Sequence, residues 1–104
     1  MTRRDDTAPG DGIPAAAAPL RVSRRTRRVL RALAVLESAN GWQVARAARF
    51  TVSGVYPVLL RLERAGWVTS WWVPGPERRR RVYALSHAGR QGFADLTERR
   101  AARG

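Results

Sequence analysis

The spacing of the apolar residues changes at Gly66, and this change constrains the fold more than any other feature of the chain. Before Gly66 the apolar side chains recur every three or four residues, which is typical of helices that are buried along one side. After Gly66 comes the run WVTSWWV, whose β-branched and aromatic residues favour a strand. The sequence therefore predicts a set of helices followed by a small sheet.

Three helices are expected before this point, over residues 24–38, 42–49 and 52–65. Their expected buried faces are Val29, Leu30, Leu33 and Leu36 in the first helix, Val44, Ala47 and Ala48 in the second, and Val55, Leu59 and Leu62 in the third. Asn40-Gly41 is interpreted as the end of the first helix, and Thr51 as the N-cap of the third. Only a couple of residues separate the second helix from the third, which is typical of a helix-turn-helix.

Two strands and a further helix are expected after Gly66. The strands cover residues 67–73 and 80–85, and the Pro-Gly-Pro turn between them makes a hairpin. Ser86 is expected to cap a last helix over residues 87–100. This order of elements predicts an α+β fold, mainly α, of the winged helix-turn-helix class, with three helices, a two-stranded wing and a C-terminal helix.

The charge of the chain indicates the kind of partner it binds. Its 20 basic side chains, all arginine, face 8 acidic ones, which gives a net charge of +12 over 104 residues. Arginine grips phosphate through two parallel hydrogen bonds, so this excess indicates a nucleic acid, with an anionic membrane or an acidic protein as alternatives. Four arginines stand side by side in VPGPERRRRVY, at the expected tip of the wing. Their mutual repulsion becomes tolerable if DNA supplies the opposite charge.

Composition divides the chain into three parts. Residues 1–22 are rich in Pro, Gly, Ala and Asp and are expected to form a disordered N-terminal tail. Residues 23–86 form the expected winged helix-turn-helix DNA-binding domain, and residues 87–104 form a C-terminal helix that is a candidate dimerisation element. The four tryptophans, at positions 42, 67, 71 and 72, are expected mostly in the core and in hairpin packing.

Twelve residues are candidates for DNA contact, namely Arg24, Arg25, Arg28, Thr51, Ser53, Gly54, Tyr56, Arg61, Arg78, Arg79, Arg80 and Arg81. Ser53 and Gly54 are small enough to approach base edges in the major groove, while the Tyr56 hydroxyl can donate to a phosphate. Arg61 is expected either to reach the DNA backbone or to pair with a nearby acid. The arginines that open the first helix either flank the duplex or form a solvated end.

Several classes of function are excluded or disfavoured. The chain has no cysteine and one histidine, His87, so thiolate metal sites and histidine-rich metal sites are ruled out. No nucleophile–histidine–acid spacing, paired-carboxylate motif or glycine-rich phosphate loop is present, so we expect neither an enzyme nor a bound cofactor. No apolar run approaches the ~20 residues of a membrane span, and a cytoplasmic location is expected.

The stretch TVSGVYPVLLRLERAGWVTS resembles the PadR-type winged-helix transcriptional regulators. In that family the third helix reads Tyr-Pro-x-Leu-x-x-Leu-Glu-x-x-Gly, matched here by Tyr56, Pro57, Leu59, Leu62, Glu63 and Gly66. A basic run followed by Tyr-x-Leu-Thr-x-x-Gly closes the wing in the family, and Tyr83, Leu85, Ser86 and Gly89 are similar to it. The resemblance covers about residues 27–95. A proline in this helix is usual in the family, although Pro57 alone predicts a kink or disturbed first turns.

The resemblance implies sequence-specific binding to double-stranded DNA and repression, which a small-molecule effector relieves in some members. A homodimer through the C-terminal helix is the assembly that it implies. Leu60 stands where the family usually has a basic residue. This departure keeps open an alternative, namely a non-specific or accessory nucleic-acid-binding winged-helix module without genes of its own to regulate.

Overall fold

A computed structural model describes residues 21–103 of the chain. Its elements are α1 (Arg24–Leu36), β1 (Ala39–Asn40), α2 (Gly41–Ala48), α3 (Val52–Arg64), β2 (Val68–Val73), β3 (Arg80–Leu85) and α4 (His87–Arg103). The expected fold is confirmed: four helices accompany a small antiparallel sheet, and the fold is mainly helical. Most of the expected N-terminal tail lies outside the described residues, but Val22 is described and packs against the core.

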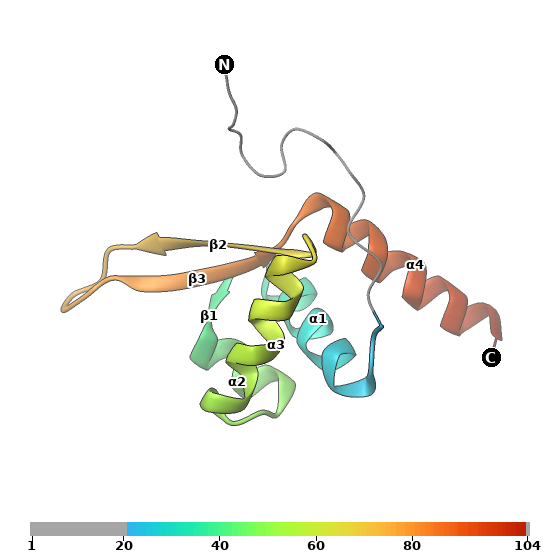
Figure 1. The fold of residues 1–104 in the computed structure, drawn as a ribbon, viewed down its shortest axis with the longest axis horizontal. Coiled ribbons are helices and arrows are strands. Elements are labelled where there is room, and N and C mark those ends of the chain that lie inside the picture. Colours follow the sequence, from blue (N-terminus) through green and yellow to red (C-terminus); the bar gives the residue numbers. More distant parts are fainter. Residues whose placement is uncertain (1–20, 104) are drawn as a thin grey trace, which may run out of the picture.

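The sheet carries one strand that the sequence did not predict. It has the order β1-β3-β2, with Ala39 opposite Tyr83 and Val68 opposite Leu85. The β1 strand is only two residues long, too short to produce an alternating apolar pattern. In Figure 1 the hairpin of β2 and β3 projects beyond the helices, and α4 extends on the opposite side of the molecule.

Local hydrogen bonds explain where the helices begin. Thr51 accepts a hydrogen bond from the Gly54 amide, so its predicted role as an N-cap is confirmed. Asn40 starts α2 rather than ending α1: its side chain accepts from the Gln43 amide, and the Gln43 side chain accepts from the Asn40 amide. This is a reciprocal capping box, and the sequence prediction placed Asn40 in the wrong helix.

The core is formed where α1, α2 and α3 meet the sheet. The predicted buried faces hold for Val29, Leu30 and Leu33 in α1, for Val44 and Ala48 in α2, and for Val55, Leu59 and Leu62 in α3. The prediction of burial was wrong for two residues. Leu36, the last residue of α1, is 37% exposed. Ala47 faces solvent, and Ala45 is the buried residue of α2 in its place. The α3 helix runs without interruption through Pro57, so its bounds show no break in the first turns, where the sequence predicted a disturbance.

The α4 helix reaches the core through a close contact with Trp67. A Cβ atom on Gly89 would overlap the main-chain carbonyl oxygen of Trp67, and one on Gly92 would lie 2.6 Å from the Trp67 ring. Phe93 and Leu96 pack against the core from the same helix, as the sequence indicated. Among the helices of residues 21–103, none is long and apolar enough to cross a membrane.

Candidate nucleic-acid interface

The first turn of α3 presents small polar side chains to solvent. Thr51 and Ser53 are exposed and Gly54 is half-buried. The Thr51 hydroxyl accepts a hydrogen bond from the Gly54 amide at 3.0 Å. A Cβ atom added to Gly54 would lie only 2.8 Å from the same hydroxyl oxygen. Thr51 and Gly54 therefore shape the helix start together, while Ser53 keeps its hydroxyl exposed.

Tyr56 links this helix to α2 and to the sheet. Its hydroxyl packs against Gly41: a Cβ atom added to this glycine would lie only 2.5 Å from the Tyr56 hydroxyl oxygen. Its ring centroid is 6.5 Å from that of Tyr83 on β3, with the two rings tilted by 59°. The side chain nevertheless remains 44% exposed, so it is held in place and still accessible.

Burial raises the pKa of Tyr83 above its ordinary value, and the neighbouring Tyr56 raises it further, while Arg81 acts in the opposite direction. Tyr83 is therefore neutral at physiological pH. It supports the floor of the interface as an uncharged side chain beside the arginines of the wing.

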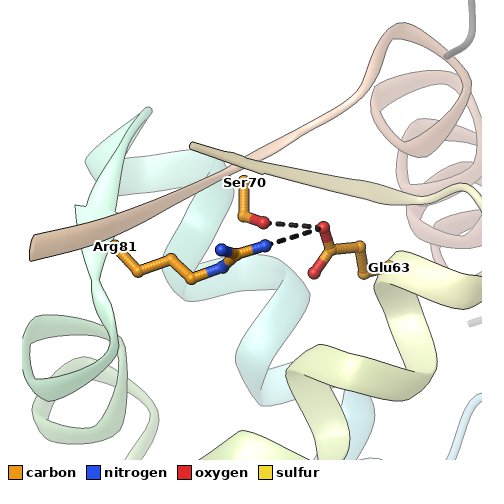
Figure 2. Close-up of polar contacts among 3 residues, drawn as sticks. All are labelled: Glu63, Ser70 and Arg81. Carbon is orange, nitrogen blue, oxygen red and sulfur yellow. Dashed lines mark hydrogen bonds and ion pairs between the residues drawn. The ribbon is translucent and has the colours of Figure 1, made fainter. Parts of the chain in front are cut away.

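A polar network joins α3 to the wing (Figure 2). The Ser70 hydroxyl donates to a carboxylate oxygen of Glu63 at 2.6 Å, and the same oxygen lies 3.7 Å from a guanidinium nitrogen of Arg81. Glu63 therefore forms an ion pair with an arginine of the wing. Because Ser70 and Arg81 are on β2 and β3, this carboxylate fixes both strands of the wing to α3.

The wing face directed toward α3 carries an aromatic ring among arginines. Trp72 lies opposite Arg81 in the β2–β3 register and shares the strand face of Ser70. The guanidinium carbons of Arg79 and Arg81 lie 4.9 Å and 5.1 Å from the centre of the Trp72 ring, within the range of cation–π contacts. Trp72 thereby restrains two arginines of the basic run along one face of the hairpin.

A cleft of about 790 Å³ separates the wing from the helices. The residues that line it are Asn40, Gly41, Trp42, Tyr56, Trp72, Pro76, Glu77, Arg78, Arg79, Arg80, Arg81 and Tyr83. The structure thus brings the four arginines of the basic run and Tyr56 of α3 to one surface. Glu77 is the single acid among the described residues that line the cleft.

Two candidate arginines of α1, Arg25 and Arg28, lie elsewhere, at the link between α2 and α3. Arg28 donates from Nε to the Ala48 carbonyl oxygen at 2.9 Å. The guanidinium carbons of Arg25 and Arg28 lie 4.6 Å and 5.1 Å from the centre of the Phe50 ring. Arg28 therefore helps to hold α1 against this link, although Arg24, Arg25 and Arg28 are all exposed.

Arg61 is also engaged within the protein. Its Nη2 atom donates to the Thr26 hydroxyl at 2.8 Å, and Thr26 is 1% exposed. The sequence indicated the DNA backbone or a nearby acid as its partner, and within the protein its partner is a buried hydroxyl of α1. This hydrogen bond ties α3 to α1.

The sequence prediction of core and hairpin packing was wrong for Trp42 among the four tryptophans. Trp67 is buried, but Trp42, Trp71 and Trp72 are 55%, 42% and 50% exposed. The adjacent positions of Trp71 and Trp72 indicated opposite strand faces, so exposure of at least one was expected. Trp42 carried no such signal, and in the structure the guanidinium carbon of Arg46 lies 5.0 Å from the centre of its ring. No group of three or more potential metal ligands occurs among residues 21–103.

Comparisons with known proteins agree with this fold. The model of the transcriptional regulator PadR-like family matches residues 33–95. The crystal structure of transcriptional regulator PA4135 aligns with a TM-score of 0.65 and 28% identity, over 74% of this chain and 56% of that one. The crystal structure of NadR in complex with 4-hydroxyphenylacetate aligns with a TM-score of 0.66 and 25% identity, over 73% of this chain and 53% of that one.

A PadR family regulator from Clostridium difficile R20291 shares the fold, with a TM-score of 0.65 and 17% identity, over 74% of this chain and 86% of that one. The chain spans only about half of the length of PA4135 and NadR. No curated protein matches the sequence significantly.

Proposed function

Because this chain belongs to the PadR-like family of transcriptional regulators, we propose that it binds double-stranded DNA at a preferred sequence and represses transcription there. Its family consists of DNA-binding regulators rather than enzymes. The observation that carries the proposal is the cleft in which Tyr56 of α3 and four wing arginines meet on one surface. A helix and a basic hairpin on the same side of a domain match the groove and the flanking backbone of a duplex.

In this proposal α3 is the recognition helix and enters the major groove by its first turn. Ser53 is the side chain best suited to read a base edge, because it is exposed and Thr51 is already engaged as a cap. Gly54 allows the close approach of the helix, and Tyr56 donates to a phosphate. The tight contact of Tyr56 with Gly41 keeps that hydroxyl in a defined position.

The wing contacts the backbone or an adjacent minor groove through Arg78, Arg79, Arg80 and Arg81. Each phosphate neutralised by these arginines adds about −0.9 to the slope of log K against log salt. Arg81 and Arg79 are restrained by Trp72, which lowers the entropy lost when they bind phosphate. Arg24 and Arg25 flank the duplex near the first turn of the recognition helix, where Arg25 lies over Phe50, while Arg28 and Arg61 act mainly by holding the helices together.

The assembly that suits this function is a homodimer through α4, which would read a palindromic site with two recognition helices. A small-molecule effector is also part of the proposal, supported by the likeness to NadR in complex with 4-hydroxyphenylacetate. A cytoplasmic location follows from a role on chromosomal DNA.

A second candidate is a non-specific nucleic-acid module with the same fold. The observation that favours it is Leu60, an apolar side chain that is 48% exposed on α3 where the family usually has a basic one. Such a module would hold DNA by the wing arginines alone and would show no preferred sequence.

Binding of two variants to specific and shuffled duplexes separates these candidates. Ser53→Ala should weaken the preferred duplex by about fivefold or more, from ~1 kcal/mol of base discrimination, and leave the shuffled duplex unchanged. Arg80→Ala should weaken both duplexes alike and reduce the salt slope by about 0.9. Equal losses from both variants on both duplexes would favour the non-specific module. Gly54→Ala is a poorer probe because its Cβ would disturb the Thr51 cap.

A further inference from the structure

Two tryptophans in the cleft are more exposed than the proposed duplex contacts require. Trp42 and Trp72 are 55% and 50% exposed, and both line the cleft. In a duplex the faces of the bases are stacked on each other, so a protein meets only base edges, sugars and phosphates. Exposed rings of this size match partners that offer a free aromatic face.

The surroundings of these rings are strongly cationic. Arg46 lies over Trp42, and Arg79 and Arg81 lie over Trp72. Tryptophan faces interleaved with arginine are typical of surfaces that bind unpaired nucleotides, where a base stacks on the ring and the arginine neutralises its phosphate. The cleft therefore combines both parts of this chemistry within one concave surface.

We propose that the cleft between the wing and α2 binds an unstacked nucleotide of a single DNA strand. The base stacks on Trp42 or Trp72, and its phosphate pairs with arginines of the wing. The cleft volume of about 790 Å³ lies within the range of pockets that enclose small aromatic ligands. All four arginines of the basic run line the cleft, more positive charge than the phosphate of one nucleotide requires, which favours a strand with several phosphates over an isolated nucleotide.

This activity goes beyond recognition of a preferred duplex and does not depend on it. Stacking tolerates every base, because each base has an aromatic face. The wing arginines are shared by both activities, so a single strand that fills the cleft competes with duplex DNA for the protein.

Trp71 provides a matched control for the aromatic residues. It neighbours Trp72 on β2 and pairs with Val82, whereas Trp72 pairs with Arg81. Alternation along the strand places Trp71 on the opposite face of the hairpin, and it does not line the cleft. Its exposed fraction, 42%, is close to the 50% of Trp72, so the two substitutions remove a similar ring from similar solvent exposure.

The test is titration of the full chain with a labelled oligothymidylate of about 12 nucleotides, a length within the site sizes known for single-strand binders, at ~150 mM salt. Trp42→Leu and Trp72→Leu should each weaken binding between about 5-fold and 150-fold, the range for losing one stacked base. Trp71→Leu should leave binding unchanged. Quenching of tryptophan emission by the strand should diminish in the two cleft variants and persist in Trp71→Leu.

Two results would overturn the proposal. Equal losses from all three variants, or wild-type affinity no higher than for inorganic polyphosphate of the same charge, would mean that stacking contributes nothing. Thymidine monophosphate binding as tightly as the strand would assign the cleft to a free nucleotide instead. Trp42→Leu keeps the test valid if Trp72→Leu disturbs the wing, since Trp42 lies on α2. If the single-strand proposal fails, the proposed duplex specificity still stands, because it is tested separately with specific and shuffled duplexes and the Ser53→Ala variant.

Discussion

Glu63 on α3 lies 3.7 Å from Arg81 on β3, so the helix proposed to read DNA and the wing proposed to grip it are joined by an ion pair. Both side chains are partly exposed, at 30% and 37%, which limits the strength of the pair in water. Its main effect is geometric. Together with the hydrogen bond from Ser70, it sets the position of the hairpin relative to α3.

A double-mutant cycle on Glu63→Gln and Arg81→Gln should give a coupling energy of about 0.2–1 kcal/mol, from the free energies of unfolding. The coupling should fall as salt is added, because both groups contact solvent. Arg80→Gln is the matched control, since Arg80 is the neighbouring arginine of the same strand and Glu63 pairs with Arg81. A coupling of Glu63 to Arg80 as large as that to Arg81 would contradict the geometry.

Gly41→Ala should weaken binding to the preferred duplex with little loss of stability. The added methyl group would lie 2.5 Å from the Tyr56 hydroxyl oxygen, and the exposed ring can turn away to avoid it. A hydrogen bond to a charged phosphate contributes about 1.5 kcal/mol or more, so we expect roughly a tenfold loss of affinity by fluorescence anisotropy. Tyr56→Phe should give a similar loss. Wild-type affinity of either variant would show that the hydroxyl does not contact DNA.

Gly89→Ala should destabilise the protein by about 1–3 kcal/mol, because the added methyl group overlaps the Trp67 carbonyl oxygen and α4 must move. Gln91→Ala changes an exposed residue of the same helix and should stay within about 0.5 kcal/mol of the wild type. Urea denaturation measures both. If Gly89→Ala behaved like Gln91→Ala, the described packing of α4 on Trp67 would be wrong.

Arg28→Ala should reduce the free energy of unfolding by about 1–2 kcal/mol, through loss of its hydrogen bond to Ala48 and of its contact with the Phe50 ring. Arg24→Ala, at an exposed position on the same helix, should change it by less than about 0.5 kcal/mol. Thermal unfolding separates the two. Equal stability of both variants would mean that the Arg28 contacts do not stabilise the fold, and would leave DNA contact as the role of Arg28.

Alkaline pH should destabilise the protein in part through Tyr83. Burial raises the pKa of Tyr83 above its ordinary value, so the unfolded chain loses this proton at a lower pH than the folded chain. The folded state then binds more protons, and the free energy of unfolding falls as the pH rises from about 10 through the higher folded pKa. Tyr83→Phe should show a smaller fall between about pH 9 and pH 11 in urea denaturation. An unchanged fall would assign the alkaline loss to other groups.

The order of the elements was predictable because each carries a local signal. Apolar spacing located α1 and α3, β-branched and aromatic residues located β2, and the Thr51 and Ser86 caps are local hydrogen bonds. Asn40 shows where local signals mislead: the same Asn-Gly pair can end one helix or begin the next, and only the capping box with Gln43 decides.

The candidate site was predictable in outline but not in its detail. A basic turn beside a helix-turn-helix identified the wing, yet the partners of Arg28 and Arg61 are residues 20 and 35 positions away in the chain. Such contacts arise only from tertiary packing. The exposure of Trp42 was missed for the same reason, since aromatic composition favours burial and only the assembled cleft shows a ring left open.

Selection from fragmented DNA of the source organism tests the central claim most directly. The purified chain would be mixed with duplex fragments at ~150 mM salt, where non-specific electrostatic binding is weakened, and the recovered fragments sequenced. Reading of bases by α3 predicts strong enrichment of one short site, arranged as a palindrome if the protein is dimeric, and loss of that enrichment in Ser53→Ala. Uniform recovery of all fragments would contradict sequence-specific regulation.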